Sequence, residues 1–359
     1  MTPLADLLAR RIEAGGPITL AEYMADCLLH PEHGYYSTRD PFGRGGDFTT
    51  APEISQMFGE LLGLALAQAW LDQGSPTPFV LAEIGPGRGT LMADVLRTLR
   101  AVPGMFAAAR VHLVEASATL RARQRETLAD QQVTWHDGID TLPEAPLLLL
   151  ANEFFDALPI RQFVRADPGW CERLVGLSPE GALQPGLSTP APLAALAHRL
   201  ADTKEGDVVE ICPAAPAIAA AIAARIARHG GAALIVDYGG WHSLGDTFQA
   251  VQDHATADPF AAPGEADLTA HVDFEPLAAA ARGAGAAASA LVPQGVLLER
   301  LGIAARAERL AQGLSGPALE SHLAAHRRLT HPGEMGRVFK ALAIHPQHHS
   351  PPPGFEPSA

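Results

Sequence analysis

The residues that decide the fold are 79–100, FVLAEIGPGRGTLMADVLRTLR. They begin with a short apolar run over 79–84, which is typical of a buried strand. Residues 90–100 then repeat apolar side chains at helical spacing. Three glycines in the intervening loop permit a tight turn and let a ligand approach the backbone at the helix N-terminus. These glycines are Gly85, Gly87 and Gly89.

Outward from this stretch, apolar strands continue to alternate with helices. Such alternation predicts an α/β fold with a doubly wound, mostly parallel sheet that is covered on both faces. The further strands are expected at 111–115, 133–136, 147–151 and 232–236, and the helices at 52–70, 118–128 and 215–228.

Three regions are expected along the chain. Residues 1–77 form an N-terminal helical cap that includes a loop rich in glycine and proline at 40–47. Residues 78–343 form the sheet domain, with an insertion at about 160–212 that we interpret as a substrate region, because ligands bind at the carboxyl ends of sheet strands. Residues 344–359 are expected to be a disordered tail.

The loop favours a cationic ligand over a dinucleotide. It has Gly-x-Gly-x-Gly spacing with Glu83 two positions before the first glycine, whereas a dinucleotide fingerprint has Gly-x-Gly-x-x-Gly. A carboxylate at Glu83 repels a pyrophosphate and suits an ammonium or sulfonium group. The pattern resembles motif I of class I (Rossmann-like) methyltransferases, so S-adenosyl-L-methionine is the expected cofactor. A nicotinamide dehydrogenase is disfavoured, and a ligand-free turn remains an alternative.

Acidic residues also follow the next strands. Glu115 closes the second strand, where its carboxylate can accept hydrogen bonds from both ribose hydroxyls. Asp137 follows the third strand and is placed to accept from the adenine amino group, although Asp-Gly is also a common turn.

The segment after the fourth strand combines two carboxylates, Glu153 and Asp156, with two aromatic rings, Phe154 and Phe155. Carboxylates can hold a guanidinium bidentately, and aromatic faces favour cations. The segment therefore suits an arginine or amine nucleophile. Alternatively, the rings belong to the core and the carboxylates cap helices.

Two N-terminal segments make a family resemblance specific. Residues 30–36 (HPEHGYY) and 46–60 (GDFTTAPEISQMFGE) resemble the MidA-like family, which contains the mitochondrial complex I assembly-factor arginine methyltransferase and its bacterial relatives. Further matches follow in the family's order over nearly the whole chain. They lie at 83–91, 152–159, 236–239, 263–274 and 335–340.

This resemblance implies a class I methyltransferase with a helical cap, symmetric dimethylation of an arginine in the quinone-site subunit of NADH:ubiquinone oxidoreductase (complex I), and a role in its assembly. It needs no metal. The cofactor residues, by resemblance and loop reading together, are Gly46, Thr50, Glu83, Gly85, Gly87, Gly89, Glu115, Asp137 and Asn152. The substrate would meet Asp47, Glu153 and Asp156, with Tyr35, Tyr36, Asp237 and Tyr238 as weaker candidates.

The composition of the chain limits which classes of partner and which cellular compartment we expect. Lysine and arginine total 26 against 40 acidic residues, a net charge of −14 that argues against a general nucleic-acid binder and favours a basic or polypeptide partner. The 3 cysteines suggest neither a disulfide framework nor a zinc site. We see no export signal, transit peptide or membrane span, and expect the cytoplasm of a bacterium, with the mitochondrial matrix for eukaryotic relatives. A homodimer is left open.

Two other functions remain alongside arginine methylation. A non-catalytic assembly chaperone would bind the cofactor only for stability. A small-molecule methyltransferase would act on a free metabolite, although the long insertion speaks against it.

Overall fold

The structure is a computed structural model, and it describes residues 2–38, 49–252 and 255–358. The chain forms two compact units, each assembled from three segments. The cap unit comprises residues 1–48, 156–215 and 242–273, and the sheet unit comprises 49–155, 216–241 and 274–359.

The sheet unit is built on one large sheet. Its strands lie in the order β15-β17-β10-β5-β2-β3-β4, with β16 beside β17. The pairs within β10-β5-β2-β3-β4 are parallel, whereas β17 is antiparallel to its neighbours. The strands are β2 (Phe79–Ile84), β3 (Ala109–Val114), β4 (Val133–His136), β5 (Leu147–Asn152), β10 (Gly231–Gly240), β15 (Ala286–Ala288), β16 (Val292–Pro293) and β17 (Phe339–Pro346).

The order of the strands reverses between β2 and β5. Ala82 of β2 pairs with His112 of β3 on one side and with Leu149 of β5 on the other. In doubly wound sheets, ligands bind outside the carboxyl ends of the strands at this reversal. The residues that follow β2, β3 and β5 are therefore the ones to examine for a site.

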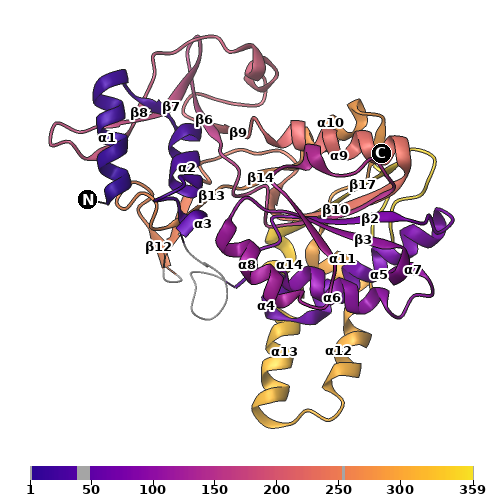
Figure 1. Cartoon of the computed structure of the whole chain (residues 1–359). Coiled ribbons are helices and arrows are strands. Elements are labelled where there is room, and N and C mark those ends of the chain that lie inside the picture. The colour runs from indigo at the N-terminus through magenta and orange to yellow at the C-terminus, as the bar shows by residue number, and fades with distance from the viewer. Residues whose placement is uncertain (1, 39–48, 253–254, 359) are drawn as a thin grey trace. The chain divides into compact units, whose positions relative to one another are not determined.

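Helices cover both faces of this sheet. In Figure 1, α9 and α10 lie over one face, and α5 and α6 lie over the other. The predicted fold class, a doubly wound α/β sheet, is confirmed. The helices are α4 (Ala51–Ile54), α5 (Gln56–Asp72), α6 (Thr90–Leu99), α7 (Met105–Ala108), α8 (Ala118–Thr127), α9 (Ala215–His229), α10 (Phe274–Gly283), α11 (Gln294–Arg300), α12 (Ile303–Ala311), α13 (Gly316–Thr330) and α14 (Met335–Val338), with a 3-10 turn at Ile139–Thr141.

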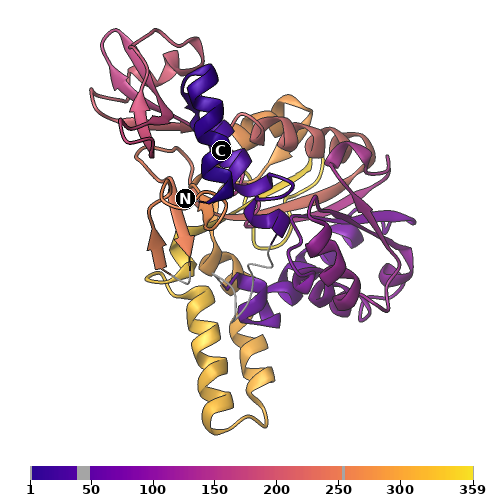
Figure 2. The same cartoon turned by 60° about the vertical axis from the view of Figure 1, so that its left-hand side comes forward.

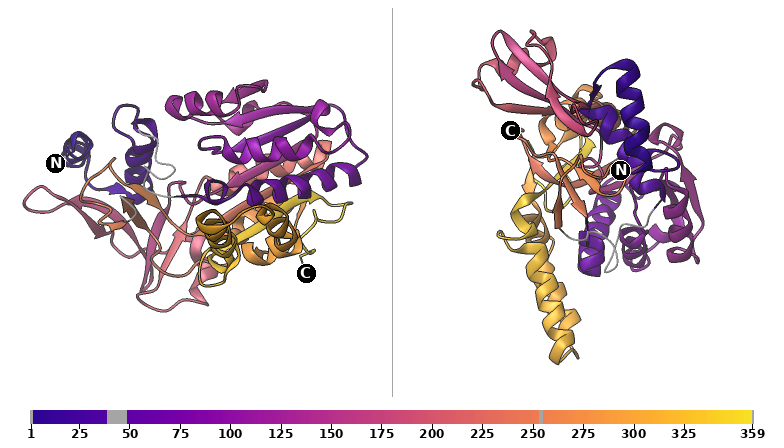
Figure 3. Two further views of the ribbon diagram at one scale, coloured as in Figure 1. Left: turned by 90° about the horizontal axis from the view of Figure 1, so that it is seen from below. Right: turned by 90° about the vertical axis from the view of Figure 1, so that its left-hand side faces the viewer.

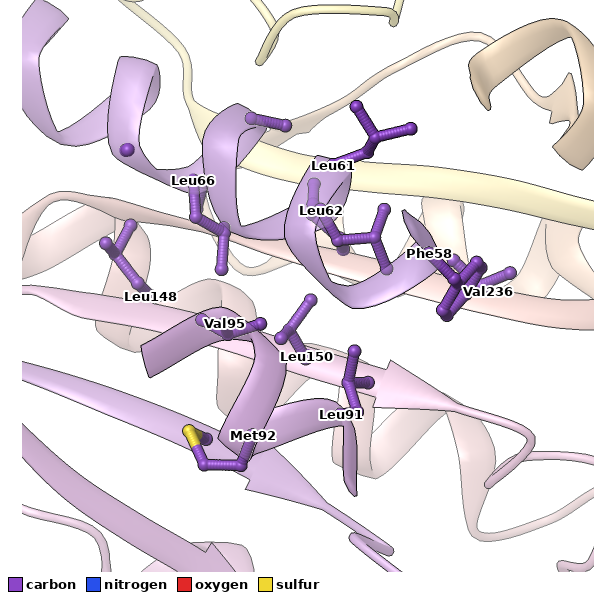
Figure 4. Packing of buried hydrophobic residues seen from close by; sticks show 14 of the residues in the cluster. Phe58, Leu61, Leu62, Leu66, Leu91, Met92, Val95, Leu148, Leu150 and Val236 are labelled. Carbon is purple, nitrogen blue, oxygen red and sulfur yellow. The ribbon is translucent and has the colours of Figure 1, made fainter. Parts of the chain in front are cut away.

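The main core of the sheet unit lies between the sheet and the helices α5 and α6 (Figure 4). The two helices approach closely at Gly59, because a Cβ atom there would lie 2.6 Å from Cβ of Asp94. Apolar side chains from both helices meet those of β5 below them. They include Leu62, Leu66, Val95, Leu148 and Leu150.

A helical hairpin, α12 and α13, extends from the sheet unit (Figure 2). α13 buries only Leu329, and Leu323 on its outer part is 56% exposed. The base of the hairpin is tied to α5, because Arg306 donates two hydrogen bonds to the buried carboxylate of Glu60.

The C-terminal segment is ordered, which corrects the expectation of a disordered tail over 344–359. β17 continues to Pro346, and Phe355 is 9% exposed and joins the main core. Arg300 donates to the carbonyl of Gly354 at 3.1 Å and to Glu356 at 2.6 Å. An apolar anchor thus holds a segment whose proline content alone suggested disorder.

The cap unit combines three helices with antiparallel strands. Strands β1, β7, β6 and β9 lie in that order, with β8 beside β7, and α1 lies against β7 (Figure 3). A second sheet has the order β12-β11-β13. The elements are α1 (Pro3–Gly15), β1 (Ile18–Thr19), α2 (Leu20–Leu29), α3 (Tyr35–Thr38), β6 (Arg161–Ala166), β7 (Gly169–Leu177), β8 (Leu183–Leu187), β9 (Val208–Ile211), β11 (Gln249–Gln252), β12 (Ala255–Ala257), β13 (Asp267–Thr269) and β14 (Val272–Asp273), with a 3-10 helix at Ala194–Leu200.

The unit boundaries differ from the expected regions. Residues 49–77 belong to the sheet unit and not to the cap, because α5 buries its apolar side chains against α6 and the sheet. Residues 242–273 join the insertion and the N-terminal helices in the cap unit. These assignments depend on packing between distant segments, which local patterns do not contain.

Candidate functional site

The glycine-rich loop joins β2 to α6 at the strand reversal. Its three glycines have φ of 64°, 52° and 83°, in the left-handed region that favours glycine. At Gly85 a side chain is excluded as well, since a Cβ atom would lie 2.8 Å from Cδ2 of Phe154. The loop is anchored by the backbone, with Gly85 N–H donating to the carbonyl of Val114 at 3.1 Å and Gly89 N–H to that of Pro86 at 2.7 Å.

Glu83 is the penultimate residue of β2, one position before Ile84 and the loop, and it is only 2% exposed. Burial raises the pKa of its carboxyl well above the usual range, and the charges of Glu115 and Asp94 raise it further, while a hydrogen bond from the Met92 backbone opposes the shift. Among the described residues, Oε2 of Glu83 has no hydrogen-bond partner. A buried carboxylate oxygen without a partner calls for a donor, and an ammonium group supplies one.

Asn152, at the end of β5, has a second oxygen of this kind. The residue is 8% exposed, and its Oδ1 finds no partner within the described parts of the chain. Its Nδ2 donates to Oε1 of Glu153 at 3.0 Å. The predicted cofactor residues Glu83 and Asn152 thus lie at the carboxyl ends of the adjacent strands β2 and β5, and each has a buried acceptor oxygen without a partner among the described residues.

Glu115 follows β3 and is 9% exposed. Its Oε1 accepts from the backbone of Ser117 at 2.8 Å, and its Oε2 accepts from Nε2 of Gln124 at 3.1 Å. Burial raises the pKa of the Glu115 carboxyl, and these hydrogen bonds oppose the shift. The carboxylate is held in one orientation and keeps acceptor capacity on both oxygens, since a carboxylate has about four lone-pair sites.

Asp137, the predicted adenine contact, lies in a different setting. Its side chain is 91% exposed and pairs with Arg121, whose Nη2 donates to Oδ1 at 2.5 Å. Arg121 also donates from Nε to the carbonyl of Glu115 at 2.7 Å. The pair brings Asp137 toward the residue that follows β3, but its carboxylate already has a cationic partner at the surface.

Glu153 begins the segment after β5 with a backbone φ of 51°, which is uncommon for a residue other than glycine. Its N–H donates to the carbonyl of Val236 at 2.9 Å, and its Oε1 accepts from the N–H of Ala51 at 3.3 Å. The next two residues are held from β10, where Oδ2 of the fully buried Asp237 accepts from the N–H groups of Phe154 and Phe155 at 3.2 and 3.0 Å. The bend therefore has a fixed shape.

Thr50 precedes α4 and is 8% exposed. The helix that it starts is tied to α6, because Oγ1 of Thr90 donates to Glu53 at 2.5 Å. The Ala51 N–H that follows Thr50 reaches Glu153. The structure thus brings Thr50 close to the bend after β5.

Asp156 is the first residue of the second cap-unit segment and is 6% exposed. Its carbonyl accepts from the N–H of Ala270 at 3.0 Å. Nearby, the hydroxyl of Tyr36 donates to Asp267 at 2.7 Å, and burial followed by the charges of Asp267 and Asp156 raises the pKa of Tyr36. Tyr35 is fully buried in the cap core. Gly46 and Asp47 lie outside the described residues.

Two residues of the site carry no signal in the sequence. Gln124 and Trp135 contact each other, and Gln124 also contacts Gly87 of the loop and Glu115. Gln124 lies in a mostly polar helix, and no local pattern distinguishes it from its neighbours. Only the family resemblance makes Asp237 a candidate substrate residue. In the structure its carboxylate accepts hydrogen bonds from Phe154 and Phe155 and so holds the bend in place. Tyr238 packs edge-on against Phe339, with ring centroids 5.4 Å apart.

Within 2–38, 49–252 and 255–358, histidine, cysteine and acidic side chains form no group of three or more that could hold a metal ion. In the same ranges no helix is long and apolar enough to cross a membrane.

Comparison with sequence families gives a match over most of the sheet unit and the insertion. Residues 61–292 match a family model for S-adenosyl-L-methionine-dependent methyltransferases. The chain is 37% identical over 372 residues to the mitochondrial protein arginine methyltransferase NDUFAF7 of Mus musculus, covering 96% of this chain and 85% of that protein. The Homo sapiens protein of the same name is 37% identical over 377 residues, with 96% and 84% covered.

Solved structures agree with these matches. A crystal structure described as that of a likely methyl transferase from Burkholderia thailandensis, bound to S-adenosylhomocysteine, is 35% identical, with a TM-score of 0.83 over 95% of this chain and 91% of that chain. A second crystal structure from the same organism has 34% identity and a TM-score of 0.80 over the same shares. The likeness thus extends over both units, and one matched structure holds the demethylated form of the cofactor.

Proposed function

The chain belongs to the S-adenosyl-L-methionine-dependent methyltransferase family, and on this premise we propose that it methylates a guanidinium nitrogen of an arginine in a protein. The acceptor that we propose is the quinone-site subunit of NADH:ubiquinone oxidoreductase, with two methyl groups added symmetrically in support of that complex's assembly. The relatives' printed name, protein arginine methyltransferase, supports the acceptor group. The compartment that we propose is the bacterial cytoplasm.

For the cofactor site we propose the residues that end β2, β3 and β5. Glu83, with its partnerless buried oxygen, would bind the ammonium group, and Glu115 would accept from the ribose hydroxyls. Asn152, Thr50 and the three glycines would line the same site, as would Gly46, which lies outside the described residues. Asp137 would reach adenine only if it exchanged its bond to Arg121. When bound, S-adenosyl-L-methionine supplies an electrophilic methyl group on a sulfonium.

The observation that carries the acceptor proposal is the bend after β5. Phe154 packs against Gly85 of the cofactor loop, and Glu153 directly precedes it in a left-handed conformation fixed by its backbone and side-chain bonds. A carboxylate and an aromatic ring at the edge of the cofactor loop suit a guanidinium group. Asp156, three residues further along the chain, and Asp47 are proposed as additional substrate residues.

The proposed role of these residues is positioning and proton transfer. Glu153 orients the guanidinium so that one nitrogen lies in line with the methyl group. As the N–C bond forms, the S–C bond breaks and its electron pair stays on sulfur, so that no covalent enzyme intermediate is needed. The proton that leaves the nitrogen passes to a neighbouring carboxylate, for which we propose Glu153 or Asp156.

The experiment that tests this proposal is tandem mass spectrometry of the purified quinone-site subunit after incubation with the protein and S-adenosyl-L-methionine. We expect a gain of two methyl groups on one arginine. Glu153→Gln should abolish the gain, and Glu299→Gln, the same change at an exposed position of α11, should retain it. Cofactor binding is measured in each sample by calorimetry.

Each alternative function predicts a different result. A non-catalytic assembly chaperone binds the cofactor but yields no mass gain, and its Glu153→Gln variant still restores assembly of the complex in cells lacking the protein. A small-molecule methyltransferase transfers a labelled methyl group to the low-mass fraction of a cell extract and not to the subunit.

A further inference from the structure

Gln124 lies beside the cofactor site proposed above and contacts two of its expected residues, Gly87 and Glu115. The residue is fully buried on α8, within a helix whose other side chains are mostly exposed. Its amide contacts three elements at once. Nε2 donates to the carbonyl of Gly87 at 2.8 Å and to Oε2 of Glu115 at 3.1 Å, and Oε1 accepts from Nε1 of Trp135 at 2.8 Å.

Trp135 determines which way this amide points. An indole N–H can only donate, so the atom of Gln124 that faces it must be the oxygen. The two N–H groups of the amide are then directed at Glu115 and Gly87, both of which present acceptor oxygens. A reversed amide would set its own donors against the indole N–H and its oxygen against a carboxylate. The contacts of this one side chain are therefore all complementary, and only in this orientation.

The consequence for Glu115 is a defined set of remaining lone pairs. Oε1 accepts from Ser117 N–H and Oε2 accepts from Gln124, and the Ala116 backbone also donates to the carboxylate. A carboxylate has about four lone-pair sites, so acceptor capacity is left for the ribose hydroxyls. The same amide holds the carbonyl of Gly87, so that the glycine loop after β2 and the carboxylate after β3 have a fixed separation.

We propose that Gln124 is a positioning residue for the cofactor, which presents the Glu115 carboxylate to the two ribose hydroxyls and couples it to the glycine loop. This inference rests on the proposed function, because it assumes that Glu115 meets the ribose. Gln124 itself would not touch the cofactor. Trp135 acts one step further away, by fixing the amide.

The role is distinguished from a merely structural one by the ligand's own hydroxyls. The experiment measures, by calorimetry, the Kd of S-adenosylhomocysteine and of its 2′-deoxy derivative for the full-length protein and for Gln124→Met. Methionine keeps the length of the side chain and removes both donors. If Gln124 positions Glu115 for the ribose hydroxyls, its loss should raise the Kd of S-adenosylhomocysteine much more than the Kd of the 2′-deoxy derivative.

We expect Gln124→Met to weaken S-adenosylhomocysteine binding about tenfold or more, the effect of losing a hydrogen bond to a charged group. For the 2′-deoxy ligand the weakening should be within about a factor of three, because part of the Glu115 contact is already absent. Trp135→Phe removes the indole N–H together with part of the ring system, leaves Gln124 in place, and should reproduce the selective loss more weakly.

Gln162→Met is the matched control. Gln162 is also fully buried, and its Nε2 donates to the buried Glu210 at 2.6 Å, but it lies on β6 in the cap unit. This variant should lower the melting temperature and leave both Kd values unchanged. Thermal unfolding of all variants identifies any that fail to fold, in which case Trp135→Phe carries the test.

Two results overturn the inference while leaving the proposed function intact. One is an unchanged Kd for S-adenosylhomocysteine in Gln124→Met. The other is an equal weakening for both ligands, which is the mark of a packing role. A wild-type protein that does not bind S-adenosylhomocysteine would instead overturn the proposed cofactor site, and this inference with it.

Discussion

Arg306 donates from Nε and Nη2 to the two carboxylate oxygens of Glu60, at 2.7 and 2.9 Å. The Glu60 side chain is 8% exposed and Arg306 is 34% exposed, so the pair joins the base of the helical hairpin to the buried surface of α5. Arg97 also reaches Glu60, at 3.1 Å. Because the carboxylate is buried, its pairing matters more than that of a surface ion pair.

Replacing Arg306 by Gln should therefore destabilise the protein by about 1–2 kcal/mol, below the usual loss for a broken buried pair because Arg306 is partly solvated and Arg97 remains. Chemical denaturation measures the change. Arg300→Gln serves as the control, since its partner Glu356 is 65% exposed, and should change stability by less than about 0.5 kcal/mol. Equal losses of stability in the two variants would show that the buried pair contributes no more to stability than the exposed pair.

Gly59→Ala should destabilise the sheet unit. The new Cβ atom would lie 2.6 Å from Cβ of Asp94, so that α5 and α6 must move apart. Overpacking of this kind costs about 1–3 kcal/mol, and the melting temperature should fall accordingly. Gly283→Ala, at the end of α10 with no atom within 4 Å of the new Cβ, should be neutral or slightly stabilising. An unchanged melting temperature for Gly59→Ala would contradict the close approach of the helices.

Glu83→Gln should stabilise the protein while it weakens cofactor binding. Burial raises the pKa of this carboxyl in the folded state above the ordinary 4.5, so the folded state binds the proton more tightly than the unfolded state does. This contribution to stability is present below pH 4.5 and is lost as the pH rises through the raised pKa. Glutamine remains neutral and avoids the loss.

The melting temperatures of wild type and Glu83→Gln, compared at pH 5 and pH 8, test this reasoning. We expect the variant's advantage to be larger at pH 8, together with a weaker affinity for S-adenosylhomocysteine. Glu180→Gln, at an exposed turn, should show neither effect. A variant that is less stable than wild type at pH 8 would mean that the buried carboxylate has compensating partners.

His112 should contribute to acid destabilisation. Burial, and then the neighbouring His136, lower the pKa of His112 to about 4 from the ordinary 6.5, and its Nδ1 lies 2.8 Å from Nε2 of His136. Between these values the unfolded state binds the proton and the folded state does not. Stability is therefore complete above pH 6.5 and is lost as the pH falls toward 4.

His112→Gln removes this proton linkage, so the free energy of unfolding should fall less steeply between pH 6.5 and 4 than in wild type. The difference accumulated over this range should be on the order of 1–3 kcal/mol. Urea denaturation at a series of pH values measures it, with the exposed His331→Gln as a control that keeps the wild-type slope. Identical slopes for wild type and His112→Gln would rule out the linkage.

The sequence by itself determined the five parallel strands of the sheet and the residues at their ends, but it did not predict the antiparallel strand β17. Apolar runs at 79–84 and 133–136 have the bounds of β2 and β4, and the predicted helix at 118–128 differs from α8 by one residue. Strand and helix periodicity, glycines at left-handed positions and acidic residues directly after strands are all local properties of the chain. For that reason Glu83 and Glu115 were placed correctly at the carboxyl edge of the sheet.

Only the tertiary structure decided how distant segments complete the site. Asp237 holds Phe154 and Phe155 across about eighty residues of chain, and Gln124 links Gly87, Glu115 and Trp135. The assignment of α5 to the sheet unit and the burial of Phe355 in the main core also depend on packing between distant segments. These contacts depend on the register of the strands and on which faces of the helices meet. Both properties arise when two or more segments pack together, so no single segment of the sequence encodes them.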